Sequence, residues 1–152
     1  MAEHPSFGTL VAWDKAGGTS YSTIGQVTSD ISGPGFSRGS IDVTNHADSD
    51  MFRQKMPGLI DAGQISFTVA FDPADATHNW ATGLLDDFDG DGCTLPAWRI
   101  TMNVCTALVT SSTWTFDGFV AGMDFSAGLE DVHRADVTVE ISGKPTLTIV
   151  TP

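Results

Sequence analysis

The clearest pattern of hydrophobic and polar positions lies near the middle of the chain, over residues 64–71. Four polar or small residues, Gln64, Ser66, Thr68 and Ala70, alternate there with Ile65, Phe67, Val69 and Phe71. Alternation with a period of two is typical of a β-strand that has one face on a core and the other toward water or a partner. We therefore predict a core strand here, with its four large apolar side chains facing inward.

The same alternation predicts further strands at residues 9–13, 20–31, 40–44, 96–105, 114–125, 137–141 and 146–150. Within 114–125 the apolar parity changes at Asp117-Gly118. We predict a β-bulge there, because one extra residue restores the inward face. The sequence Ser-Gly-Lys-Pro at 142–145 is expected to be a turn between two strands. The aromatic residues on inward faces are predicted to pack in the core, and they include Trp13, Trp80, Trp98, Trp114 and Phe116.

One segment, from Pro73 to Phe88, has the period of a helix. Asp72 provides an N-cap carboxylate and Pro73 a favourable first helical residue. Apolar residues then recur every four positions, and Gly90 and Gly92 end the pattern. We predict a helix of about four turns or fewer here, with His78 at its surface or boundary. The fold class expected for the chain is mainly β: a β-sandwich or barrel in a single domain, residues 1–152, with one flanking α-helix and a long inter-strand loop.

That long loop is the polar connection between the strand at 40–44 and the core strand. It spans residues 45–57 and is too long for a tight hairpin turn. Met51, Phe52 and Met56 give it adaptable apolar contacts, because methionine is flexible and polarizable. Arg53 and Lys55 place positive charge beside them.

The charge balance limits the partners that the chain can bind. Lys and Arg total 7 against 19 Asp and Glu, for a net charge of −12. This argues against nucleic acid or an anionic membrane as a tightly held partner, but it is compatible with DNA that passes without sticking. Basic residues in the long loop and acids after it suggest head-to-tail association, although scattered solvated charge is an equal alternative. No apolar run approaches the ~20 residues of a membrane span, and the N-terminus does not resemble a signal peptide.

Candidate chemistry in the sequence is weak. Asp87, Asp89 and Asp91, followed by Gly92, match the first half of an EF-hand calcium loop. The bidentate Glu expected at its twelfth position is Trp98, so a solvated acidic loop is the main alternative. The histidines and cysteines lack metal-site spacing, the common catalytic motifs are absent, and no cofactor is expected. Cys93 and Cys105 form at most one disulfide, and a reduced state is expected.

Several runs taken together resemble a known family. They are IGQVTSDISGPG (24–35), IDVT (41–44), MPGLIDAGQISFTVAFDP (56–73), TFDGFVAGM (115–123) and ADVTVEISGKPT (135–146). Their order and spacing resemble the major tail tube proteins of long non-contractile bacteriophage tails, a type also carried by gene transfer agents and defective prophages. The resemblance covers about residues 20–146.

This resemblance implies a structural virion protein rather than an enzyme. Hexameric rings would stack into a hollow tube, with inner strands lining a channel for DNA, and tail terminator and tail tip proteins would bind its ends. The net charge of −12 adds the expectation that this channel is acidic. The subunits would be made in the bacterial host cytoplasm and reside in the virion tail. The family's inter-ring loop would correspond to Asn45, Asp48, Asp50, Met51, Phe52, Arg53, Lys55, Met56 and Pro57.

Two other functional classes remain open on the sequence alone. A calcium- or carbohydrate-binding β-sandwich module would make use of the acidic loop at residues 87–91. An enzyme is the third alternative, and it would need a reactive side chain in a concave site.

Overall fold

The computed structural model describes residues 9–28, 30–47, 49–90, 92–102 and 111–150, and it is mainly β. Its elements in chain order are β1 (Leu10–Asp14), β2 (Ser22–Thr23), β3 (Ser37–Asp42), β4 (Lys55–Asp61), β5 (Gln64–Ala70), the 3-10 helix η1 (Leu84–Asp89), β6 (Ala97–Met102), β7 (Ser111–Ala127) and β8 (His133–Val150). Among the described residues, no helix is both long and apolar enough to cross a membrane.

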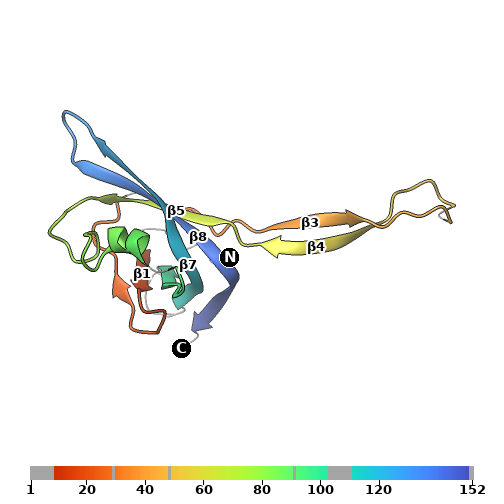
Figure 1. The fold of residues 1–152 in the computed structure, drawn as a ribbon, viewed down its shortest axis with the longest axis horizontal. Coiled ribbons are helices and arrows are strands. Elements are labelled where there is room, and N and C mark those ends of the chain that lie inside the picture. The colour runs from red at the N-terminus through yellow and green to blue at the C-terminus, as the bar shows by residue number, and fades with distance from the viewer. Residues whose placement is uncertain (1–8, 29, 48, 91, 103–110, 151–152) are drawn as a thin grey trace.

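The strands form a body with two projections (Figure 1). Among the described residues, six strands make one antiparallel sheet in the order β2-β1-β6-β7-β8-β5, and β3 pairs only with β4. The β3–β4 ribbon extends far from the body as a long arm, and the end of the β7–β8 hairpin projects in another direction (Figure 1). The sheet is not closed into a barrel, and the architecture agrees with the predicted β-sandwich class.

The core lies on one face of this sheet. Ile65, Phe67 and Val69 of β5 are all buried, as the alternation predicts, whereas Phe71 lies one residue past the strand and is half-buried. Trp98 of β6 is at the centre, and its indole lies near the rings of Trp13, Phe67 and Phe116. Aromatic and β-branched side chains dominate this core, because they fill the space between pleated strands well.

The flanking helix predicted from Pro73 is much shorter than expected. Residues 73–83 form turns, and only Leu84–Asp89 is helical, as a 3-10 element. Side-chain oxygens explain the difference. Asp72 accepts a hydrogen bond from the amide of Ala74, and Asp75 does the same for Thr77. Asx turns of this kind compete with the helical hydrogen bonds of the backbone.

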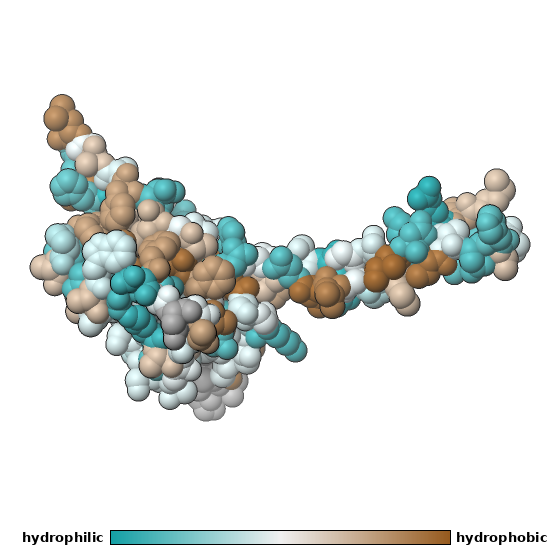
Figure 2. All heavy atoms as spheres, in the orientation of Figure 1, coloured by the Kyte–Doolittle hydropathy of each residue, from teal (hydrophilic) through white to brown (hydrophobic). Residues whose placement is uncertain are grey.

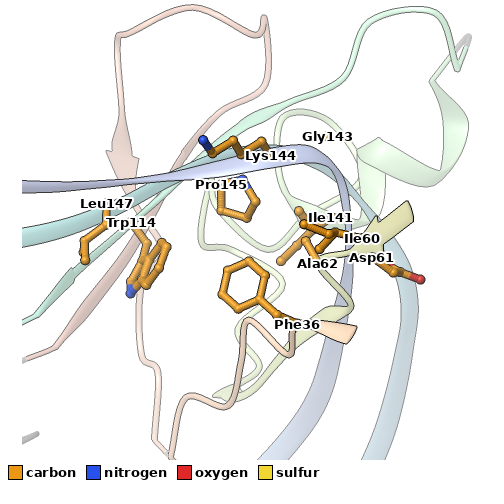
Figure 3. Close-up of a pocket in the computed structure, with 10 residues that line it drawn as sticks. All are labelled: Phe36, Ile60, Asp61, Ala62, Trp114, Ile141, Gly143, Lys144, Pro145 and Leu147. Atoms are coloured by element: carbon orange, nitrogen blue, oxygen red, sulfur yellow. The ribbon is translucent and has the colours of Figure 1, made fainter. Parts of the chain in front are cut away.

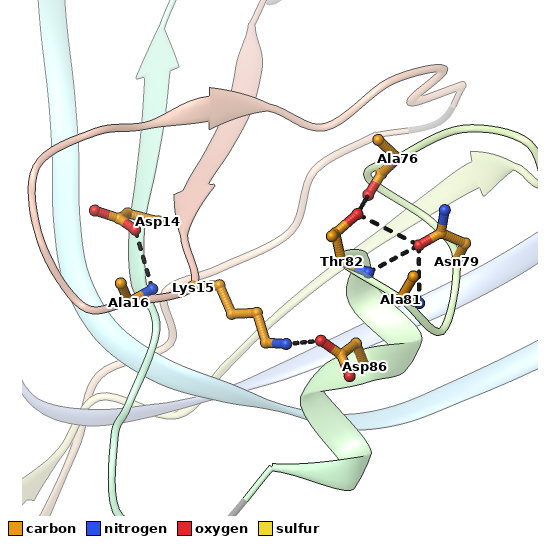
Figure 4. A network of polar contacts seen from close by, with 8 residues as sticks. All are labelled: Asp14, Lys15, Ala16, Ala76, Asn79, Ala81, Thr82 and Asp86. Atoms are coloured by element: carbon orange, nitrogen blue, oxygen red, sulfur yellow. Dashed lines mark hydrogen bonds and ion pairs between the residues drawn. The ribbon is translucent and has the colours of Figure 1, made fainter.

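Two residues in this segment also differ from their predicted positions. His78 is fully buried: its Nδ1 accepts from the amide of Asp72 at 3.2 Å, so its Nε2 carries the proton donated to the carbonyl of Gly25 at 2.8 Å. Trp80 is mostly exposed rather than in the core. The segment is tied to the body by an ion pair between Lys15 and Asp86 (Figure 4).

The irregularities of the long β7–β8 ladder also differ from the sequence prediction. Pairing shifts between Thr115 and Asp117 and again between Val120 and Gly122, so the predicted bulge at Asp117-Gly118 is misplaced and Phe119 faces outward. The turn expected at residues 142–145 is wrong, because β8 continues through it. Both Gly118 and Gly122 of β7 could accommodate a bulge, so alternation alone does not show which of the two positions the bulge takes.

Candidate functional site

The most prominent candidate for a functional surface is the β3–β4 arm. Its paired region runs from Ser37 opposite Asp61 to Asp42 opposite Lys55, and nearly all of its residues are exposed. A two-stranded ribbon has little stability of its own in water. Contact with another surface would therefore stabilise an arm of this length.

One face of the arm is apolar. Ile41 and Met56 lie directly opposite each other across the ribbon, so their side chains share a face, and Val43 follows on the same face. All three side chains are exposed, and apolar residues are visible along the arm in Figure 2. Exposed apolar side chains gathered on one face mark an interaction surface.

The predicted inter-ring loop is divided between a strand and the distal end of the arm. Lys55, Met56 and Pro57 belong to β4, a strand not predicted from the sequence because proline and glycine at 57 and 58 interrupt the strand pattern. Five of the other residues lie beyond the paired strands: Asn45, Asp50, Met51, Phe52 and Arg53. Asp48 lies outside the described residues. Met51 is fully exposed at the far end, and Phe52 is 76% exposed.

Polar contacts order the outer part of the arm. The Thr44 hydroxyl and amide both donate to the carboxylate of Asp42, which holds the pKa of Asp42 below its ordinary value. Arg53 also reaches Asp42, at 3.4 Å, and the amide of Gln54 donates to Thr44. The strands are thus linked beyond their last paired residues.

The base of the arm is fixed to the body. The amide of Gly35 donates to the carbonyl of Ala62, and the amide of Ile141 in β8 donates to the carbonyl of Gly63, both at 3.1 Å. Gly63 has a φ of +76°, and a Cβ there would lie 2.5 Å from the carbonyl oxygen of Gly35. Only glycine fits this turn without strain, so the direction of the arm is set by the chain at its base.

A second feature is the outward face of β5, β7 and β8, opposite the core. Four carboxylates extend from it: Asp117, Asp124, Asp136 and Glu140. Two of them are held by β5, since Thr68 donates to Asp136 at 2.6 Å and Gln64 donates to Glu140 at 2.9 Å. The face is therefore acidic and polar.

Within this face, two carboxylates lie directly opposite each other. Asp124 of β7 is the cross-strand partner of Asp136 of β8, and both are exposed. Like charges at paired positions destabilise a ladder. The hydrogen bond from Thr68 holds Asp136 in place but leaves the repulsion with Asp124, so the pair is a candidate for a functional rather than a structural use of negative charge.

The structure describes only part of the acidic loop at residues 87–91. Asp87 accepts a hydrogen bond from the amide of Val120 at 2.7 Å, and partial burial raises the pKa of this carboxyl. Asp89 is exposed, and Asp91 lies outside the described residues, as does Cys105. Over the described part of the chain, no three His, Cys, Asp or Glu residues are grouped so that they could hold a metal ion.

Comparisons with known proteins give one family. A family model described as phage tail tube, TTP, lambda-like, matches residues 9–151. Among curated proteins, none matches the chain in sequence.

Solved structures with the same fold come from tail-like particles. A chain in the tail of an empty gene transfer agent particle, refined with C6 symmetry, superposes with a TM-score of 0.60 at 19% identity, covering 91% of this chain and 94% of that one. A chain of the native gene transfer agent virion gives 0.63 at 17% identity, covering 96% and 99%. A chain of the six-fold symmetrised anti-feeding prophage baseplate gives 0.67 at 12% identity, covering 99% and 97%.

Proposed function

This chain belongs to the lambda-like phage tail tube family, and on that premise we propose that six copies form a ring and that the rings stack into a hollow tail tube. The family is one of structural proteins, not of enzymes. The observation that carries the proposal is the β3–β4 arm, whose apolar face is exposed while its base is fixed to the body. The six-fold symmetry of the gene transfer agent tail and of the prophage baseplate supports the number of subunits.

The arm is the contact between neighbouring subunits along the tube. The apolar face formed by Ile41, Val43 and Met56 packs on the next copy, with Met51 and Phe52 at the far end of the contact. Lys55 precedes Met56 on β4 and so lies on the other face of the arm, where it and Arg53 face acidic side chains of a neighbouring copy, which suits a chain with a net charge of −12. A head-to-tail contact of this kind is heterologous, so repetition closes a ring or extends a filament.

The acidic face of β5, β7 and β8 lines the channel. Its strands are among the longest in the body, and their outward side chains are polar. The cross-strand pair of Asp124 and Asp136 supports this orientation, because a lumen with fixed negative charge repels phosphates and lets DNA slide without binding. As a tube subunit, the chain resides in the virion tail after synthesis in the host cytoplasm. The rings at the two ends of the tube contact the tail terminator and tail tip proteins.

Electron microscopy of the purified, concentrated protein in negative stain tests the proposal. Rings or tubes with a central hole are the expected result. Particles that remain monomeric at every concentration contradict it. A variant without residues 43–54 of the arm provides a control, because its body should fold and yet fail to form tubes.

A further inference from the structure

A fully exposed leucine marks one end of the β7–β8 ladder. Leu129 lies in the turn between β7 and β8, past the last pair of Ala127 and His133, and its side chain makes no buried contact. Figure 2 shows apolar residues at the end of this projection. The turn is preformed, since the guanidinium of Arg134 makes two hydrogen bonds to Asp131, at 3.0 and 3.1 Å.

A large apolar pocket lies near the other end of the same ladder. Its volume is about 820 Å³. It opens between the base of the arm and β7–β8, and its apolar side chains come from three places (Figure 3): Phe36 and Ile60 at the arm, Trp114 on β7, and Ile141, Pro145 and Leu147 on β8.

A bulge in β8 shapes this pocket. Thr115 pairs with Thr146 and Asp117 with Ser142, so residues 143–145 of β8 oppose the single residue 116 of β7. Gly143 has a φ of +80°, which a glycine adopts without strain. The bulge carries Lys144 and Pro145 to the edge of the pocket (Figure 3).

Charge on the projection and charge at the pocket are complementary. Glu130 follows Leu129 in the turn, and the next residue, Asp131, forms an ion pair with Arg134. Beside the apolar lining of the pocket is Lys144. Among the described residues, neither Glu130 nor Lys144 forms an ion pair within its own chain.

We propose that the β7–β8 turn of one copy docks in this pocket of the next copy, with Leu129 inserted against the apolar lining and Glu130 paired with Lys144. The inference rests on the proposed function, since it adds a second contact between tube subunits. The projecting turn and the pocket occupy opposite ends of one ladder, so every added copy presents a new pocket and the contact can repeat without limit. The occupant also covers Phe36 and Ile60, which links this contact to the base of the arm.

Four variants test this contact: Leu129→Ser, Glu130→Lys, Lys144→Glu and the double charge exchange. Each changes exposed or edge residues, so thermal unfolding should match the wild type. The concentration needed for tube formation is measured by sedimentation and electron microscopy. Leu129→Ser should raise it roughly tenfold or more, because full burial of a leucine is worth more than one tenfold step in an equilibrium constant. Each single charge reversal should also raise it, and the double exchange should restore it.

The outcomes separate this contact from the proposed function. The two single reversals shift the net charge in opposite directions, so a loss shared by both and restored in the double exchange supports the pairing. Tubes that form normally from all four variants overturn the contact between the β7–β8 turn and the pocket. The tube function itself is still supported in that case, and Met51→Ser at the end of the arm tests it separately, because this variant should block assembly. Wild-type chains that never assemble overturn both.

Discussion

The apolar face of the arm provides the sharpest quantitative prediction. Ile41 is 52% and Met56 50% exposed, so about half of each side chain remains to be covered by a neighbouring copy. Complete burial of such a side chain is worth about 1.5–3 kcal/mol, so covering the remaining half is worth about 1 kcal/mol per residue. The variant Ile41→Ser/Met56→Ser should therefore weaken each subunit contact by about 2 kcal/mol, which is roughly 30-fold in the equilibrium constant.

The assay compares the concentration at which tubes sediment with the free energy of unfolding. The double variant should need a much higher protein concentration, while its unfolding free energy changes by less than about 0.5 kcal/mol, as for other surface substitutions. Ser40→Ala is the matched control, because Ser40 lies on the opposite face of the ribbon and should leave assembly unchanged. Assembly of the double variant at the wild-type concentration would refute the assignment of this face to a subunit contact.

Three further substitutions test the body of the protein. His78→Ala removes the partners of two backbone groups and leaves a cavity, so chemical denaturation should show a loss of about 3 kcal/mol, and a loss below about 1 kcal/mol would contradict the buried arrangement. Burial raises the pKa of Asp87 in the native chain above the ordinary value of 3.8, which the unfolded chain keeps. Between the unfolded and the native pKa, the native chain binds more protons, so the free energy of unfolding falls as pH rises through that window. Asp87→Asn should abolish this slope in melting temperature against pH, and an unchanged slope would assign it to another group. Asp124→Asn should raise the unfolding free energy by roughly 0.2–1 kcal/mol through relief of the repulsion with Asp136, and this gain should shrink in 1 M salt.

Alternation predicted the core strands well because each of them has one fully buried face. Ile65, Phe67 and Val69 illustrate this, and Val137 and Val139 of β8 follow the same rule. In such strands a shift of one residue would expose every apolar side chain, so pattern and burial must agree. The family resemblance also identified the correct class of protein from runs with no specific motif.

Elements whose structure depends on distant contacts or on local side-chain competition were predicted poorly. The apolar period after Asp72 is real, but hydrogen bonds from Asp72 and Asp75 to nearby amides favour turns over a helix. The strand β4 was hidden by Pro57, which an edge of a free ribbon tolerates. The pocket near Lys144 has no sequence signature, because the arm and the two strands that form it are far apart in the chain.

A reconstruction of assembled tubes by electron cryomicroscopy would show the position of every subunit. We expect six subunits per ring and the β3–β4 arm packed on a neighbouring copy. We also expect four carboxylates to face the channel: Asp117, Asp124, Asp136 and Glu140. Tubes with the acidic face turned outward, or with the arm free in solvent, would contradict this arrangement.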